Sequence, residues 1–166
     1  MSQFEKLQKV LLKELKQQEK LLELLTRERA AIAKMNREDV EALTTEKGSI
    51  LTAAHGLGKD RDVIVAGIGN DVGIENAATF KELIAHCNDS SLKKSLLSVA
   101  EELKRTATTV QELNDHNATL IKQTLGIVVS TISIFRSAAG SELPSYGRSG
   151  AVVEGNTTRP GHTRQA

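Results

Sequence analysis

The stretch SLLSVAEELKRTATTVQELNDHNATLIKQTLGIVVSTISIF, residues 95–135, decides the fold of this chain. One set of its residues recurs at steps of three or four, which is the spacing of one continuous helix face. The set comprises Leu96, Val99, Leu103, Ala107, Val110, Asn114, Asn117, Ile121, Leu125, Val128, Ile132 and Phe135. The spacing predicts a helix over 91–139, on the order of 70 Å long at about 1.5 Å per residue. Because so long a helix does not stay folded alone, other helices must lie along it.

Two earlier segments supply those helices. The first 35 residues repeat apolar side chains at helical spacing and contain no glycine or proline, so they predict one helix. Asn36 is expected to start a second helix that carries Val40, Leu43, Ile50 and Leu51. Its continuation past Gly56-Leu57-Gly58 is left open, because two glycines cost about 2 kcal/mol of helix propensity. A loop over 70–75 and a short helix over 76–86 complete the prediction, which is an all-α, elongated antiparallel bundle of three to four helices.

The last part of the chain has a different composition. Both prolines and five of the twelve glycines lie within residues 140–166, and after Ala151 only Val152 and Val153 are large and apolar. Too little apolar surface is present there to offset the entropy of ordering the chain. The predicted organisation is a helical domain over 1–140 and a disordered tail over 141–166.

Composition excludes several classes of protein. A net charge of +1 and 2% aromatic residues argue against a nucleic-acid partner, which needs basic surface or stacking platforms. A single cysteine, Cys87, excludes an internal disulfide framework, and we expect it to be a small buried residue near a helix end. Gly126 to Phe135 is the densest apolar stretch, but Ser130, Thr131 and Ser133 interrupt it, so no membrane span is predicted. The cytoplasm is the expected location.

No residue cluster predicts catalysis, a cofactor or a metal. The segment Val63 to Gly73 resembles a strand entering a phosphate-binding turn, but its glycines read GxGxxxG and no alternating strand–helix pattern surrounds them. We interpret it as a frayed helix end with a loop. The four histidines lie on separate elements with no pair at helical ligand spacing, so a metal site is not expected. The chain is predicted not to be an enzyme.

Two polar residues interrupt the long apolar face. Asn114 and Asn117 stand at positions where an amide costs stability unless its hydrogen bonds are met. One interpretation is a buried amide network that sets the register of the helices, as asparagine does in coiled coils. The other interpretation is direct contact with a partner protein.

Candidate binding residues lie further along the chain. The face at Val128, Ile132 and Phe135 has fewer helices available to cover it, and an uncovered apolar stripe suits capture of a partner helix. Isolated apolar residues of the tail are further candidates for that contact: Leu143, Val152 and Val153. Tyr146, the only tyrosine, is the most evident docking anchor because its side chain combines a large contact area with a polar tip.

These residues together resemble the FlgN type of flagellar export chaperone over nearly the whole chain. The resemblance is carried by Glu28-Arg29-Ala30-Ala31-Ile32, by Asp39 with Leu43, Glu46-Lys47 and Ile50-Leu51, and by Tyr146-Gly147-x-x-Gly150. Its most specific element is Leu113-Asn114-x-x-Asn117-x-x-Leu120-Ile121. Ala118 departs from the pattern, since the family often has glycine there, and Gly56-Leu57-Gly58 is an unusual insertion.

The resemblance implies a cytosolic escort for the hook–filament junction proteins. Such a chaperone holds the C-terminal helical segment of its substrate, prevents premature assembly, and hands the complex to the export gate and export ATPase complex. A tail tyrosine is implicated in that docking, and Tyr146 is the candidate here. The chain is expected to be a monomer or to self-associate weakly. Two alternatives stay open: a structural coiled-coil adaptor or homo-oligomeric scaffold, and a nucleotide-binding protein built on Val63 to Gly73.

Overall fold

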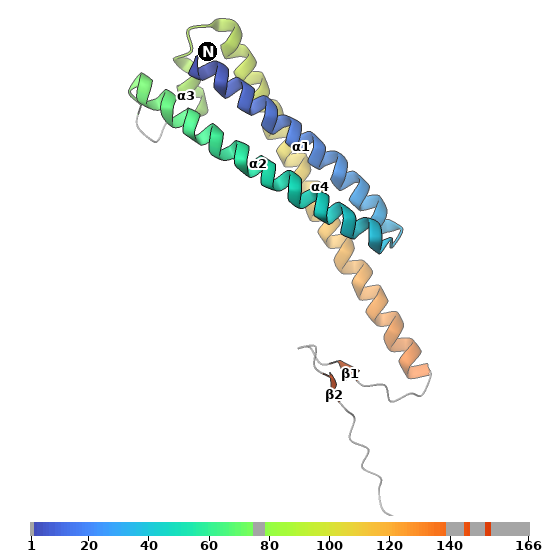
Figure 1. Ribbon diagram of the computed structural model, residues 1–166. Helices are drawn as coiled ribbons and strands as arrows, with labels where there is room; N and C mark the ends of the chain where they lie inside the picture. Colours follow the sequence, from blue (N-terminus) through green and yellow to red (C-terminus); the bar gives the residue numbers. More distant parts are fainter. Residues whose placement is uncertain (1, 75–78, 139–144, 147–151, 154–166) are drawn as a thin grey trace, which may run out of the picture. The chain divides into compact units, whose positions relative to one another are not determined.

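The computed structural model describes residues 2–74, 79–138, 145–146 and 152–153, with backbone alone for Ala138 and the last two pairs. It divides the chain into two compact units, Met1–Thr124 and Leu125–Ala166. Helices α1, α2 and α3 and most of α4 lie in the first unit (Figure 1). The predicted domain boundary at residues 140 and 141 lies outside the described residues and stays a prediction.

The first helix, α1, spans Gln3–Ala33, as the apolar spacing predicts. It starts at a capping box in which Ser2 N donates to Glu5 at 2.6 Å and Glu5 N donates to Ser2 Oγ at 3.2 Å. The chain then reverses through Met35, whose φ of 53° is in the left-handed region. Asn36 caps the next helix by accepting from Asp39 N at 3.2 Å, so the predicted cap is confirmed.

The second helix, α2, spans Arg37–Val72 without a break at Gly56 or Gly58. The frayed end predicted at Val63 to Gly69 is therefore wrong, and the loop predicted over 70–75 begins only after Val72, at Gly73 and Ile74. Packing against α1 offsets the poor helix propensity of the glycines. The helix ends at Gly73, which adopts a φ of 71°, and Ile74 N donates to Gly69 O at 2.9 Å.

Two helices follow. The short helix α3 spans Phe80–Ala85 and begins at a second capping box formed by Thr79 and Glu82. It is shorter than the helix predicted over 76–86, whose first residues lie outside the described chain. The long helix α4 spans Ser90–Ala138, close to the predicted 91–139. Asp89 caps it by accepting from Ser91 N at 2.8 Å and Leu92 N at 3.1 Å.

Within the first unit, α1 and α2 form an antiparallel hairpin and α4 runs parallel to α1 (Figure 1). Gln8, near the start of α1, donates to Ser95, near the start of α4, at 2.6 Å. Asn117, further along α4, donates to Leu25 O, further along α1. One core cluster joins all four helices: Leu7, Leu11, Ile68, Leu83, Ile84, Leu96 and Val99. Two smaller clusters fill the other end of the hairpin, at Leu21, Leu25 and Val110 and at Leu24, Ala31 and Leu43. Leu51, assigned to the apolar face of the second helix, is instead 48% exposed.

The second unit contains the last residues of α4 and two short strands. Strand β1, Ser145–Tyr146, pairs antiparallel with β2, Val152–Val153, so that Ser145 lies opposite Val153 and Tyr146 opposite Val152. These strands were not predicted from the sequence. The other residues of the predicted tail, 141–144, 147–151 and 154–166, lie outside the described residues.

Candidate functional site

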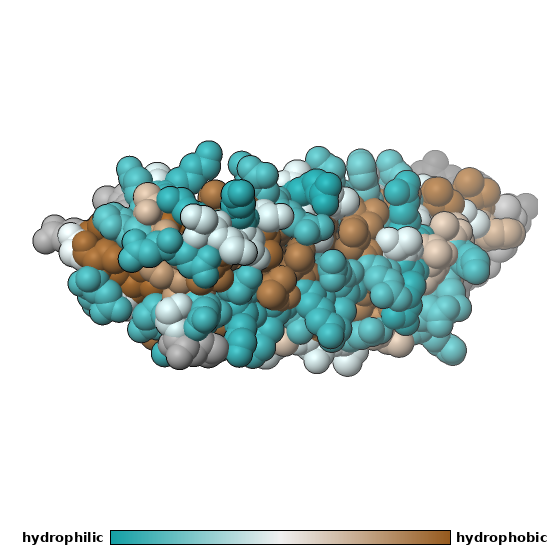
Figure 2. Space-filling model, turned by 90° about the horizontal axis from the view of Figure 1, so that it is seen from above, coloured by the Kyte–Doolittle hydropathy of each residue, from teal (hydrophilic) through white to brown (hydrophobic). Residues whose placement is uncertain are grey.

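The most unusual surface of the described chain is the part of α4 that belongs to the second unit. From Leu125 to Ser137 every side chain is exposed except that of Arg136, which is half-buried. We call residues 125–135 the apolar segment, because they expose a set of large apolar side chains: Leu125, Ile127, Val128, Val129, Ile132, Ile134 and Phe135. The extreme member is Phe135, which is 70% exposed. Apolar side chains also reach the surface elsewhere, among polar ones, on the face that Figure 2 shows.

The apolar segment has two apolar faces. At about 100° per residue, Val128, Ile132 and Phe135 share one side of the helix with Leu125 and Val129. Ile127 and Ile134, which are seven residues apart, lie on the opposite side and are 58% and 68% exposed. The sequence pattern predicted the first face and missed the second. A count of apolar residues at every helical angle, rather than along the best face, would have found it.

The hydroxyl groups within this segment bond to the backbone of their own helix. Ser130 Oγ donates to Gly126 O and Thr131 Oγ1 donates to Ile127 O, both at 2.9 Å. Ser137 Oγ donates to Ser133 O at 3.1 Å. These side chains therefore direct their donors inward along the helix. They interrupt the apolar character of the segment less than their identity in the sequence suggests.

The same helix is long and apolar enough to be a candidate membrane span. It contains an 18-residue window with a mean hydropathy of 1.5, none of which is buried. The sequence analysis predicted no membrane span, whereas this helix meets the criterion for one by length and composition. The core helix of a water-soluble protein can meet this criterion too, so the window by itself does not distinguish a bilayer from a protein partner.

The tail candidates are only partly within the described chain. Leu143 lies outside the described residues. Tyr146, Val152 and Val153 belong to the two paired strands, in which Tyr146 lies opposite Val152 and Ser145 opposite Val153. Their roles in docking and substrate binding stay predictions.

A polar layer crosses the first unit at Glu28, Lys47, Asn114 and Asn117. Asn117 is 1% exposed, and its Nδ2 donates to Leu25 O at 2.9 Å and to Glu28 Oε2 at 2.8 Å. Lys47 Nζ lies 2.7 Å from Glu28 Oε1 and donates to Asn114 Oδ1 at 3.4 Å. The layer thus ties α1, α2 and α4 together.

The sequence pattern identified the two asparagines of this layer and missed their charged partners. Glu28 is 2% exposed, and it occupies an apolar-face position of α1, three residues after Leu25 and four before Ile32. A charged residue at such a position was the available signal. Lys47 carries no comparable signal, because lysines are common at exposed helix positions.

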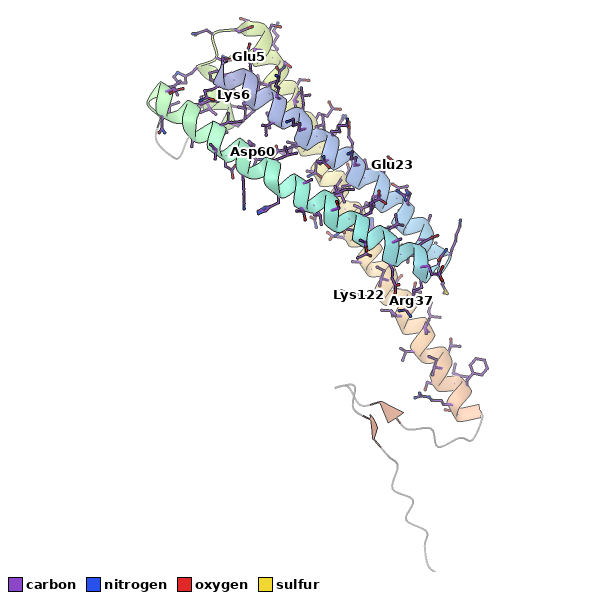
Figure 3. All side chains as sticks on the ribbon, in the orientation of Figure 1. Glu5, Lys6, Glu23, Arg37, Asp60 and Lys122 are labelled. Carbon is purple, nitrogen blue, oxygen red and sulfur yellow. The ribbon has the colours of Figure 1, made fainter. Side chains whose placement is uncertain are left out.

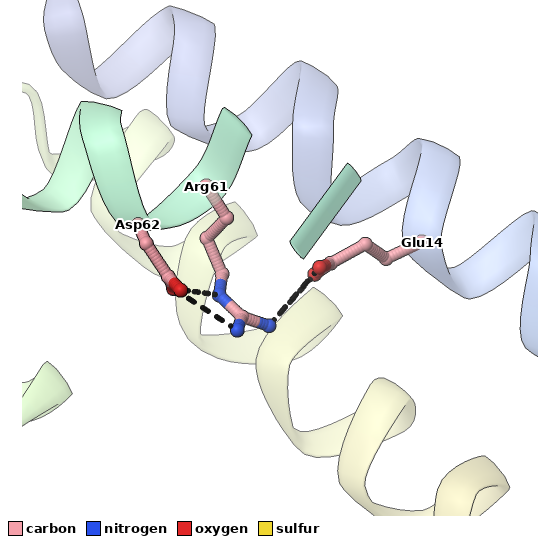
Figure 4. Close-up of polar contacts among 3 residues, drawn as sticks. All are labelled: Glu14, Arg61 and Asp62. Carbon is pink, nitrogen blue, oxygen red and sulfur yellow. Dashed lines mark hydrogen bonds and ion pairs between the residues drawn. The ribbon is translucent and has the colours of Figure 1, made fainter. Parts of the chain in front are cut away.

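A second ion pair, between buried Glu14 and partly exposed Arg61, joins the middle of α1 to α2 (Figure 4). Arg61 Nη1 lies 3.0 Å from Glu14 Oε1 and 3.2 Å from Oε2, and Arg61 Nη2 lies 3.2 Å from Asp62 Oδ1. Burial raises the pKa of the Glu14 carboxyl above its ordinary value, against the opposing effect of Arg61. Beside the pair is a groove of about 400 Å³ lined partly by Ala54, Ala100 and Ala107.

Other candidate chemistry is sparse in the described chain. Cys87 is buried at the end of α3, as predicted, and its Sγ lies 3.6 Å from Asp89 O. Within residues 2–74, 79–138, 145–146 and 152–153, no three His, Cys, Asp or Glu side chains gather as they would around a metal ion. The exposed apolar segment is therefore the candidate site.

Comparison with known proteins identifies a family. The model of one protein family, described as FlgN protein, matches residues 1–154. The match covers both asparagines, the apolar segment and Tyr146. No curated protein and no solved structure matches the chain.

Proposed function

The chain belongs to the FlgN family of flagellar export chaperones, and on this premise we propose that it is a cytoplasmic escort for hook–filament junction proteins. It binds the C-terminal helical segments of these substrates, prevents their premature assembly, and delivers them to the export gate and export ATPase complex. The contact surface is the apolar segment, in which Val128, Ile132 and Phe135 make the main contacts. Leu143, Val152 and Val153 add contacts from the tail.

The exposure of the apolar segment is the observation that carries this proposal. Seven large apolar side chains lie uncovered within eleven residues of one helix. An exposed apolar patch of this kind marks an interaction site. An amphipathic helix is a fitting partner, because it buries its own apolar face and presents its polar face to water. The junction-protein termini implied by the family are helices of this type.

The charged residues on either side of the apolar segment favour a protein helix over a bilayer as its partner. Lys122 and Arg136 enclose an uncharged run of thirteen residues, 123–135. At about 1.5 Å per residue this run covers roughly 20 Å, whereas the hydrocarbon core of a bilayer is about 30 Å thick. A helix inserted across the bilayer would bring one of these charges into the hydrocarbon core.

The same surface also supports a second candidate, self-association as a coiled-coil scaffold. Leu125, Val128, Ile132 and Phe135 follow the three-and-four spacing of a coiled-coil seam. Sedimentation over a hundredfold range of concentration separates the two candidates. The escort stays a monomer or a weak dimer, whereas a scaffold forms an obligate oligomer in which the apolar segment is buried against a second copy.

The central experiment compares two double variants by calorimetric titration with the C-terminal helical segment of a hook–filament junction protein. Ile132→Ser with Phe135→Ser removes two exposed side chains of the apolar segment. Leu12→Ser with Leu51→Ser removes two apolar side chains of the first unit that are 47% and 48% exposed. We expect the first variant to weaken binding at least about tenfold and the second to leave it within about twofold. Equal affinities for both variants would refute the proposed surface.

Delivery is tested separately from substrate binding. We expect Tyr146→Ala to bind the substrate segment normally while reducing export of the junction protein and motility, because the tyrosine is proposed to contact the gate. Deletion of residues 141–166 should additionally weaken substrate binding, since it removes Leu143, Val152 and Val153. Normal motility of the Tyr146→Ala strain would exclude the docking role.

A further inference from the structure

A row of lysines runs along the solvent side of α1. Lys6, Lys9, Lys13, Lys16 and Lys20 recur at steps of three, four, three and four, and every one is exposed. We call them the lysine row. At about 100° per residue they fall within one narrow side of the helix, over roughly 21 Å of its length. A chain with a net charge of +1 thus concentrates five positive charges on one side of a single helix.

No member of the lysine row forms an ion pair among the described side chains, and the nearest carboxylates of the same helix, those of Glu5, Glu19 and Glu23, lie one turn away from a lysine. The ion pairs found there involve other cations, those of Arg27, Arg37, Lys47, Arg61 and Arg105. The charged groups of the lysine row are therefore available to an external anion.

A groove runs beside the lysine row between α1 and α2. It has a volume of about 370 Å³ and is lined by Lys6, Lys9, Val10, Lys13, Asp60, Val63 and Ile64. In Figure 3, Lys6 marks the α1 side of this groove and Asp60 marks its α2 side. Val63 is 73% exposed, so the groove offers an apolar contact next to the lysines.

We propose that the lysine row and this groove bind an acidic amphipathic helix of a partner protein. Carboxylates spaced at three and four residues on that helix face the lysines, and an apolar side chain next to them packs on Val63 and Ile64. The surface lies wholly within the first unit and goes beyond the substrate site on the apolar segment.

Two other polyanions fit this surface less well. A membrane-binding helix inserts its own apolar face into the lipid, but the apolar face of α1 is buried in the core at Leu7, Leu11 and Leu15. A nucleic acid presents phosphates continuously, so it would meet the carboxylate of Asp60 within the groove. A protein helix can place an amide or a lysine opposite Asp60 and carboxylates elsewhere.

The test uses a synthetic 21-residue helical peptide that has five glutamates at three-and-four spacing beside a row of leucines. Its twin has glutamine at those five positions. Lys9→Gln, Lys13→Gln and Lys16→Gln are combined in one variant of the full chain. The matched control combines Lys34→Gln, Lys81→Gln and Lys94→Gln, which remove three other exposed lysines of the first unit. Fluorescence anisotropy measures peptide affinity, and circular dichroism checks that each variant is folded.

We expect the acidic peptide to bind the unmodified chain more tightly than its twin does. The lysine-row variant should lose at least about tenfold in affinity, since three ion pairs of modest individual strength are removed together, while the control stays within about twofold. Substrate-segment binding should be unchanged in both variants, so failure here is distinguishable from failure of the escort proposal. Absent peptide binding, equal losses in both variants, or tighter binding of anionic vesicles or duplex DNA than of the peptide would each overturn the proposal.

Discussion

The two ends of α4 follow one sequence pattern and have opposite environments. In the first half, Leu96 is fully buried and Val99 and Val110 are nearly so. In the second half, Val128, Ile132 and Phe135 continue the same three-and-four spacing and are 42%, 48% and 70% exposed. Periodicity therefore identifies the face of a helix that can be buried, but it does not indicate how much of that face is covered.

The end of α1 shows how far along α4 the packing within the first unit extends. Asn117 lies level with Glu28 through their hydrogen bond, and α1 ends at Ala33, five residues later. Because α4 runs parallel to α1, its partners within the first unit run out near Lys122. The first residue of the apolar segment follows three positions further along.

The largest expected contrast is in core packing. Leu96→Ala should lower the free energy of unfolding by about 2–5 kcal/mol, because it leaves a cavity in the cluster shared by all four helices. Ile132→Ala should change it by no more than about 0.5 kcal/mol, since its side chain is already in contact with water. Urea denaturation followed by circular dichroism measures both. A comparable loss for Ile132→Ala would show that the apolar segment is covered within the chain.

The polar layer tests how the covered half is anchored. Lys47→Met should cost about 2–4 kcal/mol, because the Glu28 carboxylate then stays buried without its positive partner. Arg27→Met is the control, since its pair with Glu46 is half exposed and should contribute less than about 1 kcal/mol. The same denaturation experiment compares them, and similar costs would contradict a special role for the layer.

A smaller effect should separate the two asparagines. Asn117→Ala removes the buried amide donor to Leu25 O and Glu28 Oε2, although Lys47 still pairs with Glu28, and it should cost about 1–3 kcal/mol. Asn114 is only half-buried and accepts one long bond from Lys47, so Asn114→Ala should cost less than Asn117→Ala. If Asn114→Ala instead changes the oligomeric state in gel filtration, the amide sets helix pairing and not merely local bonding.

The smallest expected effect concerns the acid response at Glu14. Its pKa is raised in the folded chain, so the folded state holds this proton more tightly than the unfolded state does. The resulting stability is present below the ordinary carboxyl pKa and is lost as the pH rises through the raised value. Unfolding of the unmodified chain and of Glu14→Gln is compared from pH 3 to 7. The free energy of unfolding of the unmodified chain minus that of Glu14→Gln should increase as the pH falls. A decrease would contradict the raised pKa of Glu14.

Much of the fold could be predicted from local patterns. The spacing of Leu7, Leu11 and Leu15 predicted α1, and Asn36 predicted the start of α2, because both signals are contained in a few consecutive residues. The continuity of α2 through Gly56 could not be predicted this way, since contact with α1 outweighs the propensity of the glycines. The partnership of Asn117 with Glu28 was missed for a related reason. Periodicity indicates which face a residue occupies but not which residue of another helix lies opposite.

The composition of the exposed half of α4 has a thermodynamic consequence. Residues 127–132 read IVVSTI, and β-branched side chains lose rotamer freedom in a helix, so this stretch has weak intrinsic helicity. Because its side chains are exposed, its amides should exchange with solvent deuterium far faster than those around Leu96. A bound partner would slow that exchange and make the heat capacity of association more negative than a rigid surface of the same area would give. Affinity for the partner and helicity of this stretch would then rise and fall together.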